Sequence, residues 1–343
     1  MKIKYNKREY NQVVNAVNDL ANTENNHNFA ADFAARAASR EWYQFLNGNT
    51  ICEINVNDGT QIMTTKDNEF NLAFPVNIDV NISNKCAIGC PFCYQGCTPK
   101  GQEADLIKFL RNKKSFLYTL KGGTELAING NEPLHPDLIK LLRFCKKRNI
   151  FANLTVNEKT FLTHEKLISS WMQKGLIHGL GISPSLYSKK MIAFASTNPN
   201  VVVHTIVGVT TKKEYLYLFS NHIKVLVLGY KLTGRGISFR KDNLLITKNK
   251  NNLKLILQAL ADDIYLVSFD NLAIQQLDPK RLLNIPDEEY ATLFRGNDGH
   301  HTMFINMVTE TYAINSVQSK KNHKPLVSSI EEMFADVKTQ AEA

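Results

Sequence analysis

Four cysteines that lie close together are the residues with the clearest chemical potential. Cys86, Cys90 and Cys93 are spaced C-x3-C-x2-C, and Cys97 follows four residues later. Thiolates are the preferred ligands of zinc in structural sites and of iron–sulfur clusters. The spacing therefore predicts a soft-metal site. Zinc would use all four cysteines, whereas a cluster held by three would leave one iron open to a substrate or cofactor.

The sequence around the cysteines favours the cluster. Residues 76–82 alternate apolar and polar side chains, which predicts a short strand that runs directly into the cysteine loop. A helical pattern follows near residues 104–119. Zinc ribbons usually pair two C-x2-C knuckles, and no second knuckle is present. A strand, a loop with reactive residues and a helix in this order are typical of the working end of an α/β barrel.

The cysteine motif resembles the signature of the radical S-adenosylmethionine (SAM) enzymes. In that family C-x3-C-x2-C follows the first barrel strand, with an aromatic residue, here Phe92, just before the last cysteine. The segment LAINGNEP at 126–133 is similar to the family's GGEP segment, with Asn131 in place of the second glycine. The resemblance covers residues 76–270.

This resemblance implies a reaction. Cys86, Cys90 and Cys93 would each ligate one iron of a 4Fe–4S cluster, and SAM would chelate the fourth iron. The reduced cluster would cleave SAM to methionine and a 5′-deoxyadenosyl radical, which abstracts hydrogen from the substrate. The chemistry belongs to the cofactor, and the protein positions the radical and excludes water. A reductant such as flavodoxin or ferredoxin would supply the electron.

The resemblance also implies a set of cofactor contacts. Phe92 would pack beside the adenine of SAM, and backbone carbonyls at the end of the second strand would accept from the methionine ammonium. Residues at the ends of later strands would touch the ribose and carboxylate of SAM. These predicted cofactor-binding residues are Phe92, Gly130, Asn131, Glu132, Pro133, Asn157, Ser183 and Gly208.

Several other residues have two interpretations each. Tyr230, Lys231 and Arg235 would contact substrate or the SAM carboxylate, or belong to a solvated loop. Cys97 would be a thiol near the cluster that quenches radicals or shields substrate, or a plain loop residue. The remaining cysteines, Cys52 and Cys145, and the pair His300–His301 are predicted to be ordinary core or surface residues.

The order of the predicted elements indicates an α/β fold. Strands are expected at 76–82, 126–130, 151–156, 179–183, 201–207, 223–229 and 264–269, with helices near 104–119, 136–147, 163–174, 186–195, 211–221 and 250–262. Six βα units match the partial (βα)6 TIM-type barrel that the resemblance implies, and apolar runs such as VVVHTIVGV suit strands that are covered on both faces.

Two additions flank this barrel core of residues 76–270. Residues 1–75 are expected to form an extension with helices at 8–21 and 28–46 and a hairpin of TICEINV and QIMTT. Residues 271–343 are expected to form a C-terminal cap with a short helix near 286–295, a hairpin and a helix at 327–340. No cysteine follows Cys145, which excludes a second cysteine-ligated cluster there.

The distribution of charged and apolar residues bears on whether the protein binds nucleic acid or a membrane. The net charge of +9 is uneven, because residues 1–75 hold seven Lys/Arg and nine Asp/Glu, a net −2, and the rest carries +11. The basic residues are spread out, which favours a solvated surface over a dense nucleic-acid-binding arm. The N-terminus lacks the apolar core of a signal peptide, and no apolar run is long enough to span a membrane. Clustered thiols without such a signal predict a cytoplasmic, oxygen-sensitive protein.

Three functions remain open from the sequence. The first is a radical SAM enzyme that acts on a peptide or protein, because a partial barrel with additions suits an extended substrate. The second is the same machinery acting on a nucleoside or RNA, in keeping with the basic body. The third is a zinc-stabilised binding module without catalysis.

Overall fold

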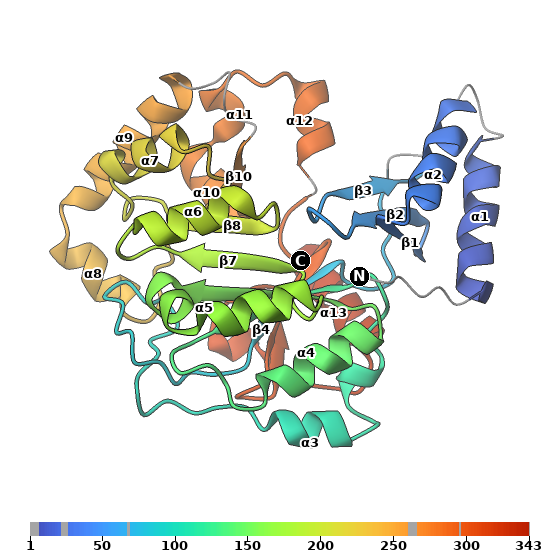
Figure 1. Ribbon diagram of the computed structural model, residues 1–343, viewed down its shortest axis with the longest axis horizontal. Helices are drawn as coiled ribbons and strands as arrows, with labels where there is room; N and C mark the ends of the chain where they lie inside the picture. Colours follow the sequence, from blue (N-terminus) through green and yellow to red (C-terminus); the bar gives the residue numbers. More distant parts are fainter. Residues whose placement is uncertain (1–6, 22–26, 67–68, 260–265, 295, 343) are drawn as a thin grey trace.

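A ten-stranded, mostly parallel sheet with flanking helices forms the body of the protein, as the computed structural model shows (Figure 1). A separate three-stranded sheet has the order β1-β2-β3, and the large sheet has the order β10-β9-β8-β7-β6-β5-β4-β11-β12-β13. The structure describes residues 7–21, 27–66, 69–259, 266–294 and 296–342.

The predicted βα alternation between residues 76 and 270 is confirmed. Each strand from β4 to β10 pairs in parallel with the next strand along the chain, so the connections are helical crossovers. The strands are β4 (Asn77–Asn81), β5 (Glu125–Gly130), β6 (Phe151–Asn157), β7 (Gly179–Ser183), β8 (Val201–Ile206), β9 (Val225–Leu228) and β10 (Val267–Phe269).

The predicted helices lie close to their expected ranges, whereas α8, α10 and α11, given below, were not predicted. The pattern at 104–119 divides into α3 (Leu106–Arg111) and a 3-10 turn, Phe116–Tyr118. The predicted residues 260–262 of the helix at 250–262 and residues 264–265 of the last strand lie outside the described residues. The other helices are α4 (Leu138–Lys147), α5 (Glu158–Gln173), α6 (Lys189–Thr197), α7 (Lys212–Ser220), α8 (Gly236–Asp242), α9 (Leu245–Ala259), α10 (Asn271–Leu277) and α11 (Pro279–Leu282).

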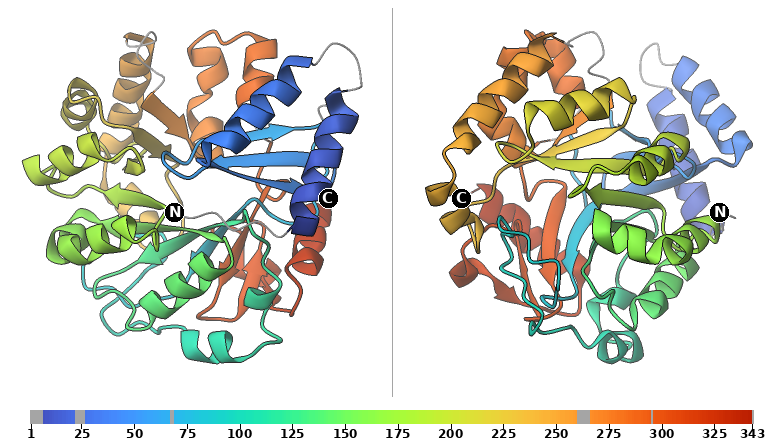
Figure 2. Two further views of the ribbon diagram at one scale, coloured as in Figure 1. Left: turned by 45° about the vertical axis from the view of Figure 1, so that its right-hand side comes forward. Right: turned by 60° about the vertical axis from the view of Figure 1, so that its left-hand side comes forward.

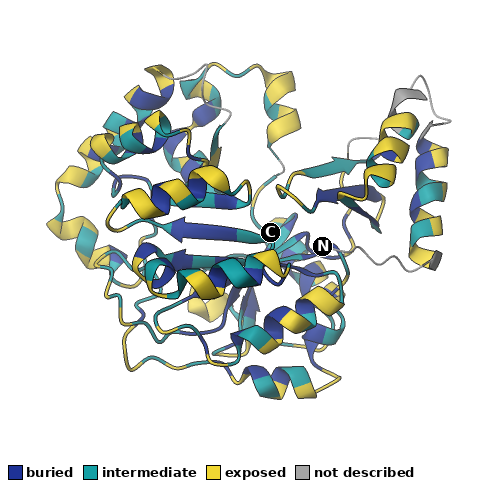
Figure 3. Cartoon of the chain, in the orientation of Figure 1, coloured by how far each residue is buried: buried dark blue, intermediate teal, exposed yellow. Residues whose placement is uncertain are grey.

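The strands bury one face more completely than the other. In β5 and β8 the fully buried residues alternate with half-buried ones. Figure 3 shows the exposed residues mainly on the helices around the sheet. The fully buried strand residues form the apolar core beneath the helices. They include Leu126, Ile128, Leu154 and Val203. The opposite, inner face carries polar side chains such as Asn129, Asn153, Thr155 and His204. The expectation of strands covered on both faces holds in part for β8 and β9, whose second face carries the half-buried apolar residues Val202, Ile206, Leu226 and Leu228.

The N-terminal unit contains one strand that the sequence analysis assigned to a helix. Helix α1 (Lys7–Ala21) is followed by α2 (His27–Ser39), which ends where Arg40 adopts a left-handed φ of 59°. Residues 42–47 then form β1 (Trp42–Asn47), which pairs with β2 (Thr50–Asn55). Aromatic residues in alternation favour a strand, and Gly48 makes the turn. The predicted hairpin of β2 and β3 (Gln61–Thr64) is confirmed.

This unit packs on the amino-terminal ends of the central strands. The ring of Tyr43 lies 5.7 Å from that of Phe151, the first residue of β6. The Gln61 amide donates a hydrogen bond to the carboxylate of Glu125, the first residue of β5. The cysteine loop follows the opposite, carboxyl end of β4. The N-terminal unit thus closes the end of the sheet away from the cysteines, and Figure 2 shows it beside the main body.

The C-terminal segment extends the main sheet. After α12 (Asp287–Leu293), strand β11 (Thr302–Asn306) pairs in parallel with β4. The predicted hairpin is present, because β12 (Thr311–Ala313) pairs antiparallel with β11 and then with β13 (Lys324–Pro325). Helix α13 (Ile330–Glu342) buries Met333, Phe334 and Val337 in the main core.

Side-chain contacts join the two halves of the sheet. The Asn271 amide, just after β10, donates to the Asp298 carboxylate, just before β11, at 2.7 Å. The Lys231 ammonium, after β9, donates to the Ser316 hydroxyl, after β12, at 3.0 Å. Segments next to strands that are distant in sheet order are thereby connected. Within the described ranges, no helix is long and apolar enough to cross a bilayer.

Candidate metal and cofactor site

The cysteine loop begins where β4 ends and is held there by β5. The amide nitrogens of Asn129 and Asn131 both donate to the Ser83 carbonyl, at 2.8 and 2.7 Å. The backbone N–H of Ala87, the residue after Cys86, donates to the Glu132 carbonyl at 2.7 Å. The two motifs that carried the family resemblance are therefore in direct contact at the carboxyl ends of neighbouring parallel strands.

Arg235 fixes the loop from the other side. Its Nε donates to the Cys90 carbonyl at 2.9 Å, and its Nη1 donates to the Cys97 carbonyl at 2.7 Å. Its backbone N–H donates to the Cys93 carbonyl at 3.0 Å. All five guanidinium donors are held in one planar fork, so these bonds set both position and orientation. Arg235 thus has a structural role in the cysteine loop, and its contact with substrate or a SAM carboxylate stays a prediction.

Gly234 allows the close approach that this arrangement needs. Its φ is +53°, and a Cβ at this position would lie 2.4 Å from the Tyr94 carbonyl oxygen and 2.8 Å from that of Cys93. The neighbouring Thr233 hydroxyl donates to the same Tyr94 carbonyl at 3.1 Å. A side chain at Gly234 would push the loop after β9 away from the cysteines.

The four thiols are close enough to affect each other's ionisation. A hydrogen bond from the Cys97 thiol lowers the pKa of Cys93 to about 5, although burial opposes this. The same hydrogen bond and burial raise the pKa of Cys97. Burial, together with the charges of Cys93 and Cys86, raises the pKa of Cys90. Cys93 is thus the cysteine of this loop whose thiolate form is favoured.

The thiols are neighbours without forming a closed ligand sphere. All six cysteines are unbridged, and the three motif cysteines are half-buried. Among the described residues, no three His, Cys, Asp or Glu side chains are arranged around a common point that could hold a metal ion. As a donor set the three cysteines fit an iron–sulfur cluster, and binding it would require their side chains to turn toward one point.

Phe92 lies where the loop meets the strand ends. Its ring packs edge-to-face on Phe239 of α8, with the centroids 5.7 Å apart. It also lines a small cavity of about 50 Å³ with Tyr94, Lys231 and the ends of β8 and β9. The Lys231 ammonium lies 4.2 Å from the centroid of the Tyr94 ring, a cation–π contact. The loop and the end of β9 therefore enclose one apolar niche.

The predicted residues at the later strand ends mostly have structural partners. The Asn157 side chain caps α5 by accepting from the Lys159 N–H at 2.9 Å. Gly208 has φ +79°, and a Cβ there would lie 2.7 Å from Ile246 of α9. Ser183 ends β7 and is half-buried. Their contacts with SAM stay predictions.

The GNEP segment also has contacts within the protein. Gly130 ends β5, and a Cβ there would lie 2.6 Å from Val156, so glycine permits tight strand packing. The Glu132 carboxylate lies 3.3 Å from His164 of α5. The carbonyl of Glu132 is already bound by Ala87, and Pro133 continues the chain into the loop before α4.

No protein-family model matches this sequence, and no curated protein is detectably similar to it.

Two functional features escaped sequence reasoning. Glu158 begins α5 and is fully buried, and its carboxylate accepts backbone N–H bonds from Ser185, Leu186, Tyr187 and Ser188 at 2.6–2.9 Å. It thereby fixes the turn after β7. Asp79, in the middle of β4, faces the polar side of the sheet. The sequence did contain a sign that Asp79 is unusual, because acidic residues are depleted in strands and Asp79 lies in the middle of one.

Proposed function

We propose that this protein is a radical SAM enzyme that acts on a peptide or protein substrate. The observation that carries the proposal is the meeting of two motifs at the carboxyl ends of β4 and β5. There the Ala87 N–H, within the C-x3-C-x2-C loop, binds the Glu132 carbonyl of GNEP at 2.7 Å. Ligands bind at this end of parallel strands in α/β barrels. The contacts across the sheet support the partial barrel that the sequence predicted.

In this proposal the cysteine loop would hold a 4Fe–4S cluster through Cys86, Cys90 and Cys93. When bound with SAM, the cluster would supply the one-electron chemistry that starts hydrogen abstraction. Arg235 positions the loop through its bonds to the Cys90 and Cys97 carbonyls. Phe92 and Tyr94 would form an apolar wall beside the adenine and exclude water.

The inner face of the sheet is where the substrate would lie. Its side chains on β5 and β6 include the half-buried polar residues Asn129, Asn153 and Thr155, whereas on β8 and β9 it is mostly apolar. The N-terminal unit closes the opposite end through the contacts of Tyr43 and Gln61. Substrate would therefore enter from the cysteine-loop end. Acidic groups on this inner face disfavour the alternative of a phosphate-bearing RNA.

Cys97 allows the cluster to be distinguished from zinc. A tetrahedral zinc site would need Cys97 as its fourth ligand, whereas the cluster would leave it free. We would reconstitute the protein anaerobically with iron and sulfide and measure iron, sulfide and zinc per chain. The variants are Cys90→Ala and Cys97→Ala, with Cys52→Ala in the N-terminal sheet as the control.

The proposal predicts about four iron ions per chain in the wild type, Cys52→Ala and Cys97→Ala, and loss of most iron in Cys90→Ala. Stoichiometric zinc that both Cys90→Ala and Cys97→Ala abolish would contradict the proposal. That result would identify a zinc-stabilised binding module instead.

A further inference from the structure

A groove runs between helices α4 and α5 on the outer side of the sheet. Its volume is about 940 Å³, which is large enough for several side chains of a partner. Figure 1 shows the two helices side by side, toward the viewer. On the α5 side the residues that line the groove run from His164 to Lys174, a length of about 15 Å along the helix axis. The α4–α5 groove is therefore an elongated feature of the surface.

One end of the α4–α5 groove lies at the candidate site. Pro133, the last residue of the GNEP segment, lines the groove there. The His164 ring, on the α5 side, lies 3.3 Å from the Glu132 carboxylate of the same segment. At the other end the Lys146 ammonium of α4 donates to the Lys174 carbonyl and joins the two sides. A peptide that lies along the groove would therefore have one end beside the GNEP segment.

Large apolar side chains line the α4–α5 groove. Trp171 and Leu176 are almost fully buried and form its floor, whereas Ile139 is half-buried and Leu167 is 43% exposed. Apolar surface that is gathered in a concave region gains free energy when the apolar side chains of a partner cover it. The groove thus offers contacts to side chains such as leucine.

The lysine and arginine residues of the α4–α5 groove have no acidic counterpart among the described residues that line it. Arg143 and Lys146 come from α4, and Lys174 follows α5. Neither the Arg143 guanidinium nor the Lys174 ammonium makes a hydrogen bond or an ion pair with the described residues. These two cations are therefore available to acidic side chains of a partner.

Two acids that neighbour the lining residues in sequence already have cationic partners. Asp137, just before α4, pairs with Lys140 at 2.7 Å. Glu165 of α5 pairs with Lys190 of α6. The charge that remains unpaired along the groove is therefore positive, and it would attract an acidic partner and favour its orientation.

Two other kinds of ligand fit the α4–α5 groove less well. The phosphates of a nucleic acid would meet the cations, but its bases would meet aliphatic side chains, and Trp171 is too buried to stack on a base. An extended peptide would find few backbone partners, because the N–H and C=O groups of α4 and α5 are bonded within the helices. A helix satisfies its own backbone and can place apolar side chains in a groove.

We propose that the α4–α5 groove binds an amphipathic helix of the protein substrate, whose apolar side chains contact Leu167 and Trp171 and whose acidic side chains meet Arg143 and Lys174. The proposal rests on the proposed function for the identity of this partner as the substrate, and it names the segment by which the substrate is recognised. The chain next to the bound helix would lie beside the GNEP segment and the cysteine loop.

The test measures binding of helical peptides to the reconstituted full-length protein by fluorescence anisotropy. The first fluorescein-labelled peptide has leucines at i, i+3, i+4 and i+7 and glutamates on its other face. A second peptide has lysine in place of each glutamate, a third has serine in place of each leucine, and a labelled oligouridine represents nucleic acid. We expect the first peptide to bind at least tenfold more tightly than each of the other probes, and its affinity should fall as salt is added.

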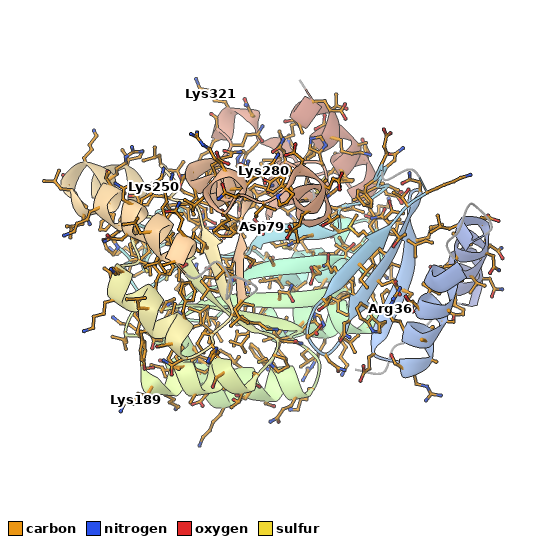
Figure 4. The ribbon with its side chains drawn as sticks, turned by 90° about the horizontal axis from the view of Figure 1, so that it is seen from above. Arg36, Asp79, Lys189, Lys250, Lys280 and Lys321 are labelled. Atoms are coloured by element: carbon orange, nitrogen blue, oxygen red, sulfur yellow. The ribbon has the colours of Figure 1, made fainter. Side chains whose placement is uncertain are left out.

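Matched variants test the residues of the groove. Arg143→Glu and Lys174→Glu should each weaken binding of the first peptide at least fivefold, whereas Lys189→Glu should change it less than twofold. Lys189 begins α6, is exposed and points to the outside of the molecule in Figure 4, so it carries the same charge outside the groove. Leu167→Gln should weaken binding at least threefold. Its control is Leu216→Gln on α7, at a leucine that is also 43% exposed.

The fluorescence of Trp171 reports where the peptide binds. The chain has two tryptophans, so Trp171 is the only one in a Trp42→Phe variant. The first peptide, in unlabelled form, should shift the emission of this variant. Binding without such a shift would place the peptide outside the groove and overturn the proposal.

Equal binding of the acidic and basic peptides, tighter binding of oligouridine, or unchanged affinity in Arg143→Glu and Leu167→Gln would each overturn the proposal as well. Unfolding of the variants at the wild-type temperature verifies that they are folded. SAM cleavage is measured separately. Peptide binding without SAM cleavage would remove the proposed function alone, and SAM cleavage without peptide binding would remove this inference alone.

Discussion

The Arg235 guanidinium donates to the Cys90 carbonyl at 2.9 Å, which connects the loop after β9 to the middle of the cysteine motif. A second bond to the Cys97 carbonyl at 2.7 Å makes the contact bidentate. Residues that are 145 positions apart in sequence are thus held in one geometry. The cysteine loop is long and lacks regular structure, so its shape depends on such contacts.

Arg235→Lys should weaken metal retention by the loop. An ammonium cannot reproduce two directed bonds of a planar fork, and charged hydrogen bonds of this kind contribute about 1.5–3 kcal/mol each. We expect the variant to keep less than half of the wild-type iron after reconstitution and gel filtration. Arg240→Lys, at an exposed position of α8, is the matched control. Equal iron in both variants would show that Arg235 does not position the loop.

Gly234→Ala and Gly89→Ala separate backbone strain from steric conflict. Both glycines have a left-handed φ, +53° and +72°, so each substitution costs about 1–2 kcal/mol of strain. Only Gly234 is crowded, because nothing lies within 4 Å of a Cβ at Gly89. Chemical denaturation should show a clearly larger loss of stability for Gly234→Ala. Equal losses would indicate that the loop after β9 moves freely.

Glu158→Gln should destabilise the protein by about 2–3 kcal/mol, because the amide offers only one acceptor oxygen to the four N–H groups that bind the carboxylate. Burial opposes the charge of Glu158, but the hydrogen bond from Ser188 and the backbone N–H bonds lower its pKa overall. Its stabilisation is therefore present above about pH 4.5 and lost as pH falls through the lowered pKa. Urea denaturation at neutral pH measures the difference, with exposed Glu288→Gln as the control. A difference below about 0.5 kcal/mol, the usual size of a surface substitution's effect, would contradict this role.

His204 should make the fold sensitive to mild acid. Burial lowers its pKa to about 4, whereas the unfolded chain titrates near 6.5. Between these pH values the unfolded state binds the additional proton, so stability falls as pH decreases from about 6.5 to 4, by about 3 kcal/mol in total. His204→Gln should flatten the pH dependence of the unfolding free energy in this window. An unchanged pH slope in the variant would show that His204 is protonated in the fold.

The sequence predicted the strands from β4 to β9 well, because each is a short apolar or alternating segment. It failed at residues 42–47, where Trp42 and Phe45 fit a helical spacing as well as a strand alternation. Pairing with β2, which follows after a tight turn, decides between these, and the apolar spacing of residues 42–47 alone does not show it. The position of β11 beside β4 was likewise beyond local pattern, since the two strands are more than 200 residues apart.

In the candidate site, too, some features could be predicted from local sequence and others depend on distant contacts. The cysteines and GNEP were identified by type and spacing, and their contact follows from adjacent parallel strands. Arg235 was assigned only a general contact, because nothing local indicates which carbonyls its guanidinium binds. Asp79 was overlooked, since its neighbours and charge environment come from β10, β11 and the loop after β9.

Reductive cleavage of SAM tests the central claim most directly. The reconstituted protein would be incubated anaerobically with dithionite and SAM, and 5′-deoxyadenosine would be quantified beside a Cys90→Ala control. A radical SAM enzyme should form this product at least tenfold above the control, even without its substrate. Product at the level of the control, in protein that has taken up its full complement of iron, would contradict the claim.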